Sequence, residues 1–242
     1  MSSILDRRLE LLNKRYEDTG PLSIISAITE EEFEPGKVAL VSSFGTESAV
    51  LLHMISRIRP DLPILFLDTG KLFGETKRYR DQLVKLLGLT DVRSITPDPV
   101  RIKDLDAKGV LWSQNPNACC EIRKVEPLAR AVAPFDAWFT GRKAFQAATR
   151  AKLPGLELTD GKFKVNPIVG WGKAEIDAYF ERYDLPRHPL EADGYLSIGC
   201  MPCTSRVEAG EDARAGRWRG SEKVECGIHL PGGQLPAITT DA

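Results

Sequence analysis

The fold of this 242-residue chain is decided by Lys37-Val38-Ala39-Leu40-Val41-Ser42-Ser43-Phe44-Gly45-Thr46-Glu47-Ser48. The apolar run after Lys37 has the length of a buried strand. Small and hydroxyl-bearing residues follow at once over 42–48. Apolar residues at helical spacing then continue until Pro60, namely Leu51, Met54, Ile55 and Ile58. A strand, a loop and a helix in this order predict the first half of a βαβ unit.

The same alternation continues along the chain in both directions. Short buried strands are predicted at 63–67, 92–95 and 137–140. Helices are predicted around Leu5-Leu9-Leu12-Tyr16, Tyr79-Leu83-Leu86-Leu87 and Ile176-Tyr179-Phe180-Tyr183. This pattern predicts the α/β class, with a largely parallel sheet flanked by helices. Right-handed crossovers bring the loops after parallel strands to one edge, so 42–48, 68–70 and 141–150 are expected to converge.

Composition narrows the class of protein. The formal net charge is −1, which argues against a sequence-independent nucleic-acid binder. The N-terminus has no apolar signal core, and no apolar run approaches the roughly 18 residues that span a bilayer. We therefore expect a cytoplasmic protein with neither nucleic acid nor membrane as a partner. Its oligomeric state stays open, with a homo-oligomer among the options.

The end of the chain differs from the rest. Residues 184–242 are rich in glycine, proline and charge and have no strong period. We expect one domain, in which residues 1–205 form the α/β body. Residues 206–242 would add a basic active-site loop and a mobile C-terminal tail to the same domain.

Five cysteines are an odd number, so they cannot form a closed disulfide framework. Two pairs stand out, the adjacent Cys119-Cys120 and the Cys200-Met201-Pro202-Cys203 motif. Four thiolates can bind either zinc or an iron–sulfur cluster. Adjacent cysteines favour the cluster, because neighbouring side chains diverge and a cubane offers separate corners. The simpler alternative for Cys119 and Cys120 is that they are small buried apolar residues.

The fifth cysteine, Cys226, lies in Glu225-Cys226-Gly227-Ile228-His229-Leu230. A thiol on a terminal segment can approach a substrate and then a second protein, which suits a nucleophile discharged by an external dithiol. His229 could lower the thiol's pKa or bind an anion. The alternative is an incidental cysteine. Lys124 follows Cys120 by about one helical turn and could stabilise thiolates, or it could be a solvated surface lysine.

Three segments are candidates for anion binding. The loop 42–48 could present a glycine, hydroxyls and a helix N-terminus to an anion, or it could simply cap the helix. It lacks the lysine of a Walker A sequence. Basic clusters occur at Gly141-Arg142-Lys143 with Gln146 and Arg150, and at Arg214-Ala215-Gly216-Arg217-Trp218-Arg219. Arginine pairs well with phosphate and sulfate oxygens, although solvated surface charge is the default interpretation of either cluster alone.

Together these motifs resemble one family, the assimilatory sulfonucleotide reductases, and within it the iron–sulfur-containing adenylyl-sulfate reductases. The resemblance is carried by Ser43-Phe44-Gly45-Thr46-Glu47-Ser48, Leu67-Asp68-Thr69-Gly70, Cys119-Cys120-Glu121-Ile122-Arg123-Lys124, Cys200-Met201-Pro202-Cys203, Gly210-Glu211-Asp212-Ala213-Arg214-Ala215-Gly216-Arg217-Trp218 and Glu225-Cys226-Gly227-Ile228-His229. Two stretches depart from the family pattern: 141–150 is looser, and the order Ser42-Ser43-Phe44-Gly45 differs slightly.

The resemblance implies an adenine-nucleotide α-hydrolase-like, Rossmann-like fold. It implies a [4Fe–4S] cluster on Cys119, Cys120, Cys200 and Cys203, with Cys226 as the catalytic nucleophile. The substrate-binding residues that it implies are Ser43, Phe44, Gly45, Ser48, Asp68, Thr69, Lys124, Gly141, Arg142, Arg150, Arg214, Arg217 and His229.

The implied reaction is reduction of adenylyl sulfate to sulfite and AMP in assimilatory sulfate reduction. It passes through an S-sulfocysteine, and reduced thioredoxin is the separate electron donor. The nearest alternative is the same chemistry on phosphoadenylyl sulfate. An ATP-pyrophosphatase would share the strand–loop–helix start but would leave the terminal cysteine unexplained. A cluster-bearing redox sensor or a zinc-stabilised interaction module is the non-enzymatic alternative.

Overall fold

A single sheet organises the computed structural model, which describes residues 3–146, 150, 152–221, 223 and 225–229. Within these residues the sheet has six strands in the order β3-β2-β1-β4-β6-β5. All neighbouring strands are parallel except β5 and β6. The strands are β1 (Val38–Ser42), β2 (Ile64–Leu67), β3 (Val92–Ile95), β4 (Ala137–Phe139), β5 (Leu156–Thr159) and β6 (Lys162–Val165). The predicted α/β class and its largely parallel sheet are confirmed.

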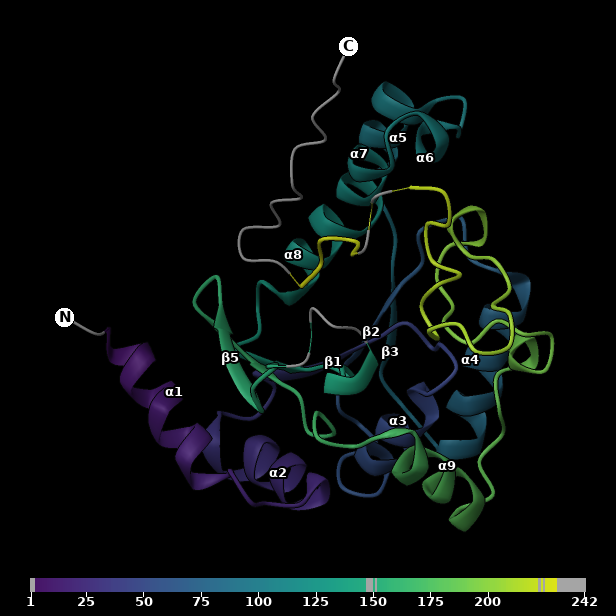
Figure 1. Ribbon diagram of the computed structural model, residues 1–242. Coiled ribbons are helices and arrows are strands. Elements are labelled where there is room, and N and C mark those ends of the chain that lie inside the picture. The colour runs from purple at the N-terminus through teal and green to yellow at the C-terminus, as the bar shows by residue number, and fades with distance from the viewer. Residues whose placement is uncertain (1–2, 147–149, 151, 222, 224, 230–242) are drawn as a thin grey trace.

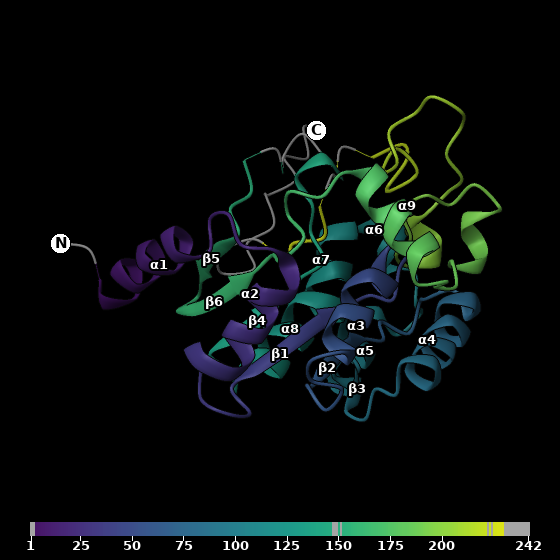
Figure 2. The same ribbon diagram turned by 90° about the horizontal axis from the view of Figure 1, so that it is seen from below.

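Helices flank this sheet on both sides (Figure 1). They are α1 (Ile4–Arg15), α2 (Pro21–Ala27), α3 (Ser48–Ser56), α4 (Gly74–Leu87), α5 (Pro99–Asp106), α6 (Leu111–Gln114), α7 (Pro116–Cys120), α8 (Glu126–Val132) and α9 (Lys173–Arg182). A π-helical stretch, Glu121–Val125, joins α7 to α8. From below, α1 lies at the β5 edge of the sheet and α4 toward the β3 edge (Figure 2). No helix in the described part of the chain is long and apolar enough to cross a membrane.

Strand alternation divides the core into two clusters, one on each face of the sheet. On β1, Leu40 packs into the larger cluster with α1, α3, α4 and α9, and Ala39 faces the smaller one beneath α8. On β6, Phe163 and Val165 face the larger cluster. By the same alternation Lys164 faces the other side, and its side chain is fully buried there. A buried cation therefore occupies a strand position where an apolar residue is the norm.

The hairpin of β5 and β6 was not among the predicted strands, although its signal is present in the sequence. Asp160 and Gly161 both have positive φ, 51° and 74°, as the tight turn between twisted antiparallel strands requires. Alternating apolar and polar residues flank this Asp-Gly pair. The hairpin matters because it carries two charged residues that contact side chains or backbone of the candidate site.

Candidate active site

A cavity of about 230 Å³ lies at the carboxyl ends of β1 and β4. It is walled by the loops that follow these strands and by residues 196–199, 213–218 and 225–229. Of the residues predicted from the sequence, those that line it are Ser43, Gly45, Ser48, Lys124, Gly141, Arg142, Arg150, Arg214, Arg217, Cys226 and His229. The position agrees with the rule that ligands of open α/β sheets bind beyond the carboxyl ends of the strands.

The side chain of Phe44 anchors the loop after β1 to the hydrophobic core. Its φ is +49°, and its fully buried ring packs edge-on against Phe66 with centroids 5.4 Å apart. This burial leaves Ser43 and Gly45 facing the cavity, with α3 starting at Ser48. Phe44 was predicted to bind substrate, but its side chain is part of the hydrophobic core.

Asp68 and Thr69, also predicted to bind substrate, lie outside this cavity. They line a neighbouring groove of about 500 Å³ beside α5. Asp68 pairs with Lys77 at 2.7 Å, and Thr69 Oγ1 lies 3.2 Å from Cys200 Sγ in a hydrogen bond. Of the three loops expected to converge, two meet at the cavity and the third reaches the cysteines.

Lys143 and Glu47 connect the two loops that meet. Lys143 Nζ lies 2.8 Å from Glu47 Oε2, and both side chains are largely buried. Burial lowers the pKa of Lys143, and Glu47 opposes that shift. The charge of Lys143 is therefore directed at a carboxylate of the protein.

Arg150 and Arg214 meet at one carboxylate, that of Glu225. Arg150 donates to Glu225 Oε1 from Nε at 3.0 Å and from Nη2 at 2.7 Å. Arg214 Nη2 donates to Glu225 Oε2 at 3.2 Å. The acidic partner of these two predicted arginines was not anticipated.

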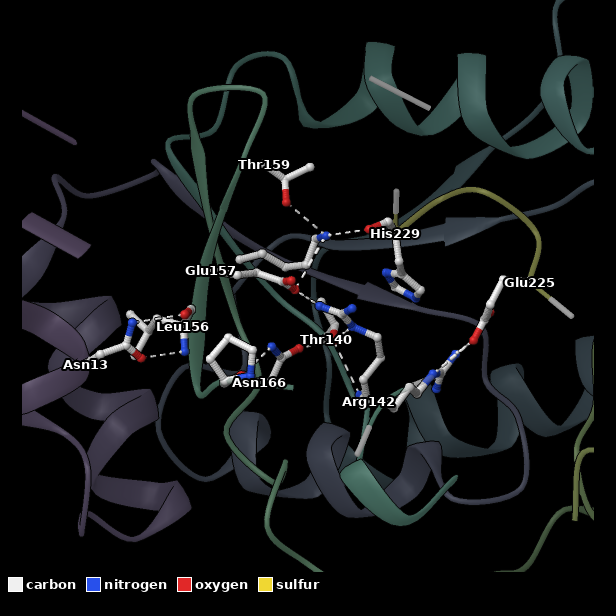
Figure 3. Close-up of polar contacts among 12 residues, drawn as sticks. Asn13, Thr140, Arg142, Leu156, Glu157, Thr159, Asn166, Glu225 and His229 are labelled. Carbon is white, nitrogen blue, oxygen red and sulfur yellow. Dashed lines mark hydrogen bonds and ion pairs between the residues drawn. The ribbon is translucent and has the colours of Figure 1, made fainter. Parts of the chain in front are cut away.

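Arg142 pairs with Glu157 of the hairpin (Figure 3). Burial, together with the nearby Arg150, lowers the pKa of Arg142 to about 10. Lys164 Nζ lies 3.5 Å from Glu157 Oε1 and donates to Thr159 Oγ1 at 3.1 Å. Burial and the charge of Arg142 lower the pKa of Lys164 to about 7. Glu157 and Lys164 were not predicted as site residues, and only their charge at buried hairpin positions could have indicated them.

The segment around His229 is docked on the sheet beside α8 (Figure 1). The His229 ring stacks on Trp138, with centroids 6.2 Å apart and an interplanar angle of 11°. Ile228 packs against the smaller core cluster. Burial and the surrounding cations, Arg142 first among them, hold the pKa of His229 well below its ordinary value, so the ring is neutral at pH 7.

Four residues that line the cavity have a buried polar atom without a hydrogen-bond partner within the described residues. The atoms are His229 Nδ1, Arg217 Nε, Trp218 Nε1 and Arg142 Nη2, the last of which belongs to the guanidinium that pairs with Glu157. Buried polar groups in native proteins are almost always satisfied by protein, water or ligand. Because these residues line one cavity, a polar ligand or water held there could supply the missing partners.

Cys226 is only 9% exposed and packs against Cys120 and Trp218. The expected mobile tail thus includes a packed part, since Cys226 and Ile228 contact the body. The remainder, 230–242, lies outside the described residues. Arg217 lies over the Trp218 ring, 4.5 Å from its centroid, so a cation flanks the cysteine's apolar neighbour.

The other four cysteines come from two segments that the fold brings together. Cys119 and Cys120 end α7, and Cys200 and Cys203 bound a short 3₁₀ turn tied to the loop after β2 through Met201 N–H and Lys71 O at 2.8 Å. All five thiols are free. Burial raises the pKa of Cys119 to about 12 and that of Cys120 to about 11.

Lys124 lies between these cysteines and Cys226. Burial disfavours its charge, but the thiolates of Cys200, Cys226 and Cys120 outweigh this and raise its pKa above the ordinary value. Conversely, burial works against the Cys200 thiolate, yet Lys124 and Thr69 together lower its pKa. Lys124 therefore favours the thiolate form of Cys200, whereas burial disfavours that of Cys119 and Cys120.

Comparison with known proteins places this geometry in context. Residues 37–206 match the family described as the phosphoadenosine phosphosulfate reductase domain. A relative from Mesorhizobium japonicum is 52% identical over 96% of this chain and 90% of its own length. One from Chelativorans sp. is 48% identical over 98% of this chain and 97% of its own. Both are called adenosine 5′-phosphosulfate reductase. A relative from Gloeobacter violaceus, called phosphoadenosine 5′-phosphosulfate reductase, is 37% identical over 91% of this chain and 93% of its own.

Solved structures agree on the architecture. The phosphate complex of phosphoadenylyl-sulfate reductase from Candida auris superposes with a TM-score of 0.69 at 25% identity, over 86% of this chain and 98% of that one. The FMN adenylyltransferase of Candida glabrata, in complex with FAD and pyrophosphate, reaches 0.55 at 14% identity, over 90% of this chain and 85% of that one. The second likeness concerns the fold alone.

Proposed function

The chain belongs to the phosphoadenosine phosphosulfate reductase family, and we propose that it reduces adenylyl sulfate to sulfite and AMP through Cys226. One observation carries the proposal. A buried thiol lies on the wall of a cavity that also presents Arg214, Arg217 and Lys124. A nucleophile surrounded by cations is what attack on an anionic sulfate group needs.

The proposed chemistry has two stages. The Cys226 thiolate attacks the sulfate sulfur, an S–S bond forms, and the bond from sulfur to the phosphate oxygen breaks with release of AMP. Cations of the cavity stabilise the charge that develops on the transferring group and the leaving phosphate. A dithiol protein, of which thioredoxin is the proposed example, then attacks the S-sulfocysteine. It releases sulfite and becomes a disulfide, supplying the two electrons.

We further propose that Cys119, Cys120, Cys200 and Cys203 hold a [4Fe–4S] cluster. No set of His, Cys, Asp or Glu side chains in the described part of the chain is arranged around a single metal ion. A cubane instead gives each thiolate its own iron, which suits two pairs contributed by separate segments. When bound, the cluster would place negative charge next to Lys124. The positive charge of this buried lysine would balance it.

Residues 206–229 belong to the same domain in this proposal. Thr204 and Arg217 form a β-bridge, and Trp218 N–H donates to Cys203 O at 3.1 Å, so this segment is built against the cysteine site. The reducing conditions that keep five thiols free and a thioredoxin reduced favour a cytoplasmic location.

Trapping tests the reaction. The enzyme is mixed with labelled adenylyl sulfate in the absence of any reductant, and we expect one labelled sulfonate on the peptide that contains Cys226. Label on another cysteine, or none, would contradict the assignment. Turnover is then compared between adenylyl sulfate and its 3′-phosphorylated form. A clear preference for the latter would place the chain with its Gloeobacter relative in substrate choice.

A further inference from the structure

The residue immediately before the proposed nucleophile, Glu225, directs its carboxylate at the substrate-binding cations. Among the described residues, Arg150 donates two hydrogen bonds to the carboxylate oxygens and Arg214 donates one. The side chains of this trio are 19%, 10% and 16% exposed, in the order Glu225, Arg150 and Arg214. It is therefore a largely desolvated contact, which is worth more than an exposed ion pair.

A carboxylate presents oxygens to arginine in much the same way as a sulfate or phosphate group. Both arginines line the cavity, as does Glu225 itself. An anion that reached these guanidinium groups with Glu225 still in place would bring two negative charges within a few ångströms in a poorly solvated site. Such like charges disfavour each other, so the two anions compete for the arginines.

We propose that Glu225 is an internal competitor for the anion site: it occupies Arg150 and Arg214 when no substrate is bound, and the phosphosulfate group of the substrate displaces it. Because Cys226 follows directly in the chain, displacement also frees the nucleophile from its packed position against Cys120 and Trp218. Substrate entry and release of the thiol are thereby one event. The inference rests on the proposed function only in taking the displacing ligand to be a sulfated nucleotide.

A different role for the same residue predicts the opposite result. If Glu225 served only to orient the arginines, its removal would loosen them and weaken anion binding. If it competes, its removal takes away one anion that binds them and strengthens binding of the ligand. The sign of the change separates the two roles.

The experiment measures binding of AMP and of inorganic sulfate by calorimetry to the wild type and to Glu225→Gln, which keeps the shape and removes the charge. If the carboxylate occupies the arginines about nine-tenths of the time, both ligands should bind roughly tenfold more tightly to the variant. Glu211→Gln is the matched control, because Glu211 pairs with Arg219 at 2.6 Å at an exposed position outside the cavity lining. Its affinities should equal those of the wild type.

Repeating the comparison in the Arg150→Ala variant tests whether the gain in affinity depends on Arg150. Arg150→Ala removes one of the two contested cations, the one that donates two of the hydrogen bonds to Glu225, so adding Glu225→Gln should produce a much smaller gain. Unchanged or weaker binding of both ligands to Glu225→Gln would overturn the inference. Failure of the proposed function would give a different result. AMP would then bind neither the wild type nor Glu225→Gln, while binding of sulfate would still test the competition.

Discussion

Lys164 Nζ donates a hydrogen bond to the main-chain carbonyl oxygen of His229 at 3.4 Å, so a lysine buried on β6 holds the segment that follows Cys226. Lys164 also lies 5.0 Å from the centroid of the Trp138 ring, on which His229 stacks. The view of Figure 3 places the His229 ring between Arg142 on one side and Glu225 on the other. The docked position of the terminal segment thus depends on the hairpin as well as on the cysteine site.

Lys164→Met should slow sulfite release by up to about tenfold, because loss of one hydrogen bond, worth up to about 1.5 kcal/mol, loosens the docked segment. AMP binding should change little, since Lys164 is not among the residues that line the cavity. Steady-state kinetics and AMP calorimetry measure the two effects. The control is Lys85→Met, an exposed lysine of α4. A large loss of AMP affinity with an unchanged turnover number would count against a docking role.

Stability should rise with pH in a window that Lys164 sets. Its pKa is lowered to about 7 in the folded protein, so between there and the ordinary lysine value the unfolded chain binds a proton that the folded chain has lost. Linkage then makes the free energy of unfolding increase with pH, by at most about 1.4 kcal/mol per pH unit from this group. Denaturant titrations at pH 6, 7.5 and 9 give the free energy of unfolding at each pH. The slope of this free energy against pH should be smaller in Lys164→Met than in the wild type. Equal slopes would show that Lys164 does not titrate in this range.

Two cysteine substitutions should separate the proposed nucleophile from the proposed ligands. Cys226→Ser should retain iron and visible absorbance but release no sulfite, because an alcohol is a far weaker nucleophile at neutral pH. Cys200→Ser should lose most of its iron. Iron analysis and a sulfite assay on the same preparations give both readouts. Iron loss in Cys226→Ser with iron kept in Cys200→Ser would invert the assignment.

A buried ion pair beneath the cysteine site should be important for stability. Arg123 Nη2 lies 2.6 Å from Asp106 Oδ2, with side chains 9% and 1% exposed, and Arg123 Nη1 donates to Thr69 O at 2.8 Å. Asp106→Ala leaves the buried guanidinium without its counter-charge and should cost about 3–5 kcal/mol. Asp61→Ala removes the exposed partner of Arg59 and should cost less than about 1 kcal/mol. Urea unfolding of the two variants makes the comparison, and equal midpoints would refute it.

The sequence by itself determined the four parallel strands β1 to β4 and the helices α1, α3, α4 and α9, because apolar period and turn residues are local properties of the chain. Several motifs were also recognisable in the sequence, and they sufficed to identify the family. These are the loop after β1, the two cysteine pairs and the terminal cysteine. The Asp160-Gly161 hairpin was legible in the same way, although the sequence analysis did not use it.

Only the tertiary structure decided which charges meet. Glu225 and Arg150 are 75 positions apart, and His229 and Lys164 are 65 apart. No local period encodes such contacts, since they depend on the order of strands in the sheet and on where the terminal segment crosses it. The same cause moved Phe44 into the core and turned Thr69 toward Cys200: a motif specifies residue types, whereas packing decides which way each side chain faces.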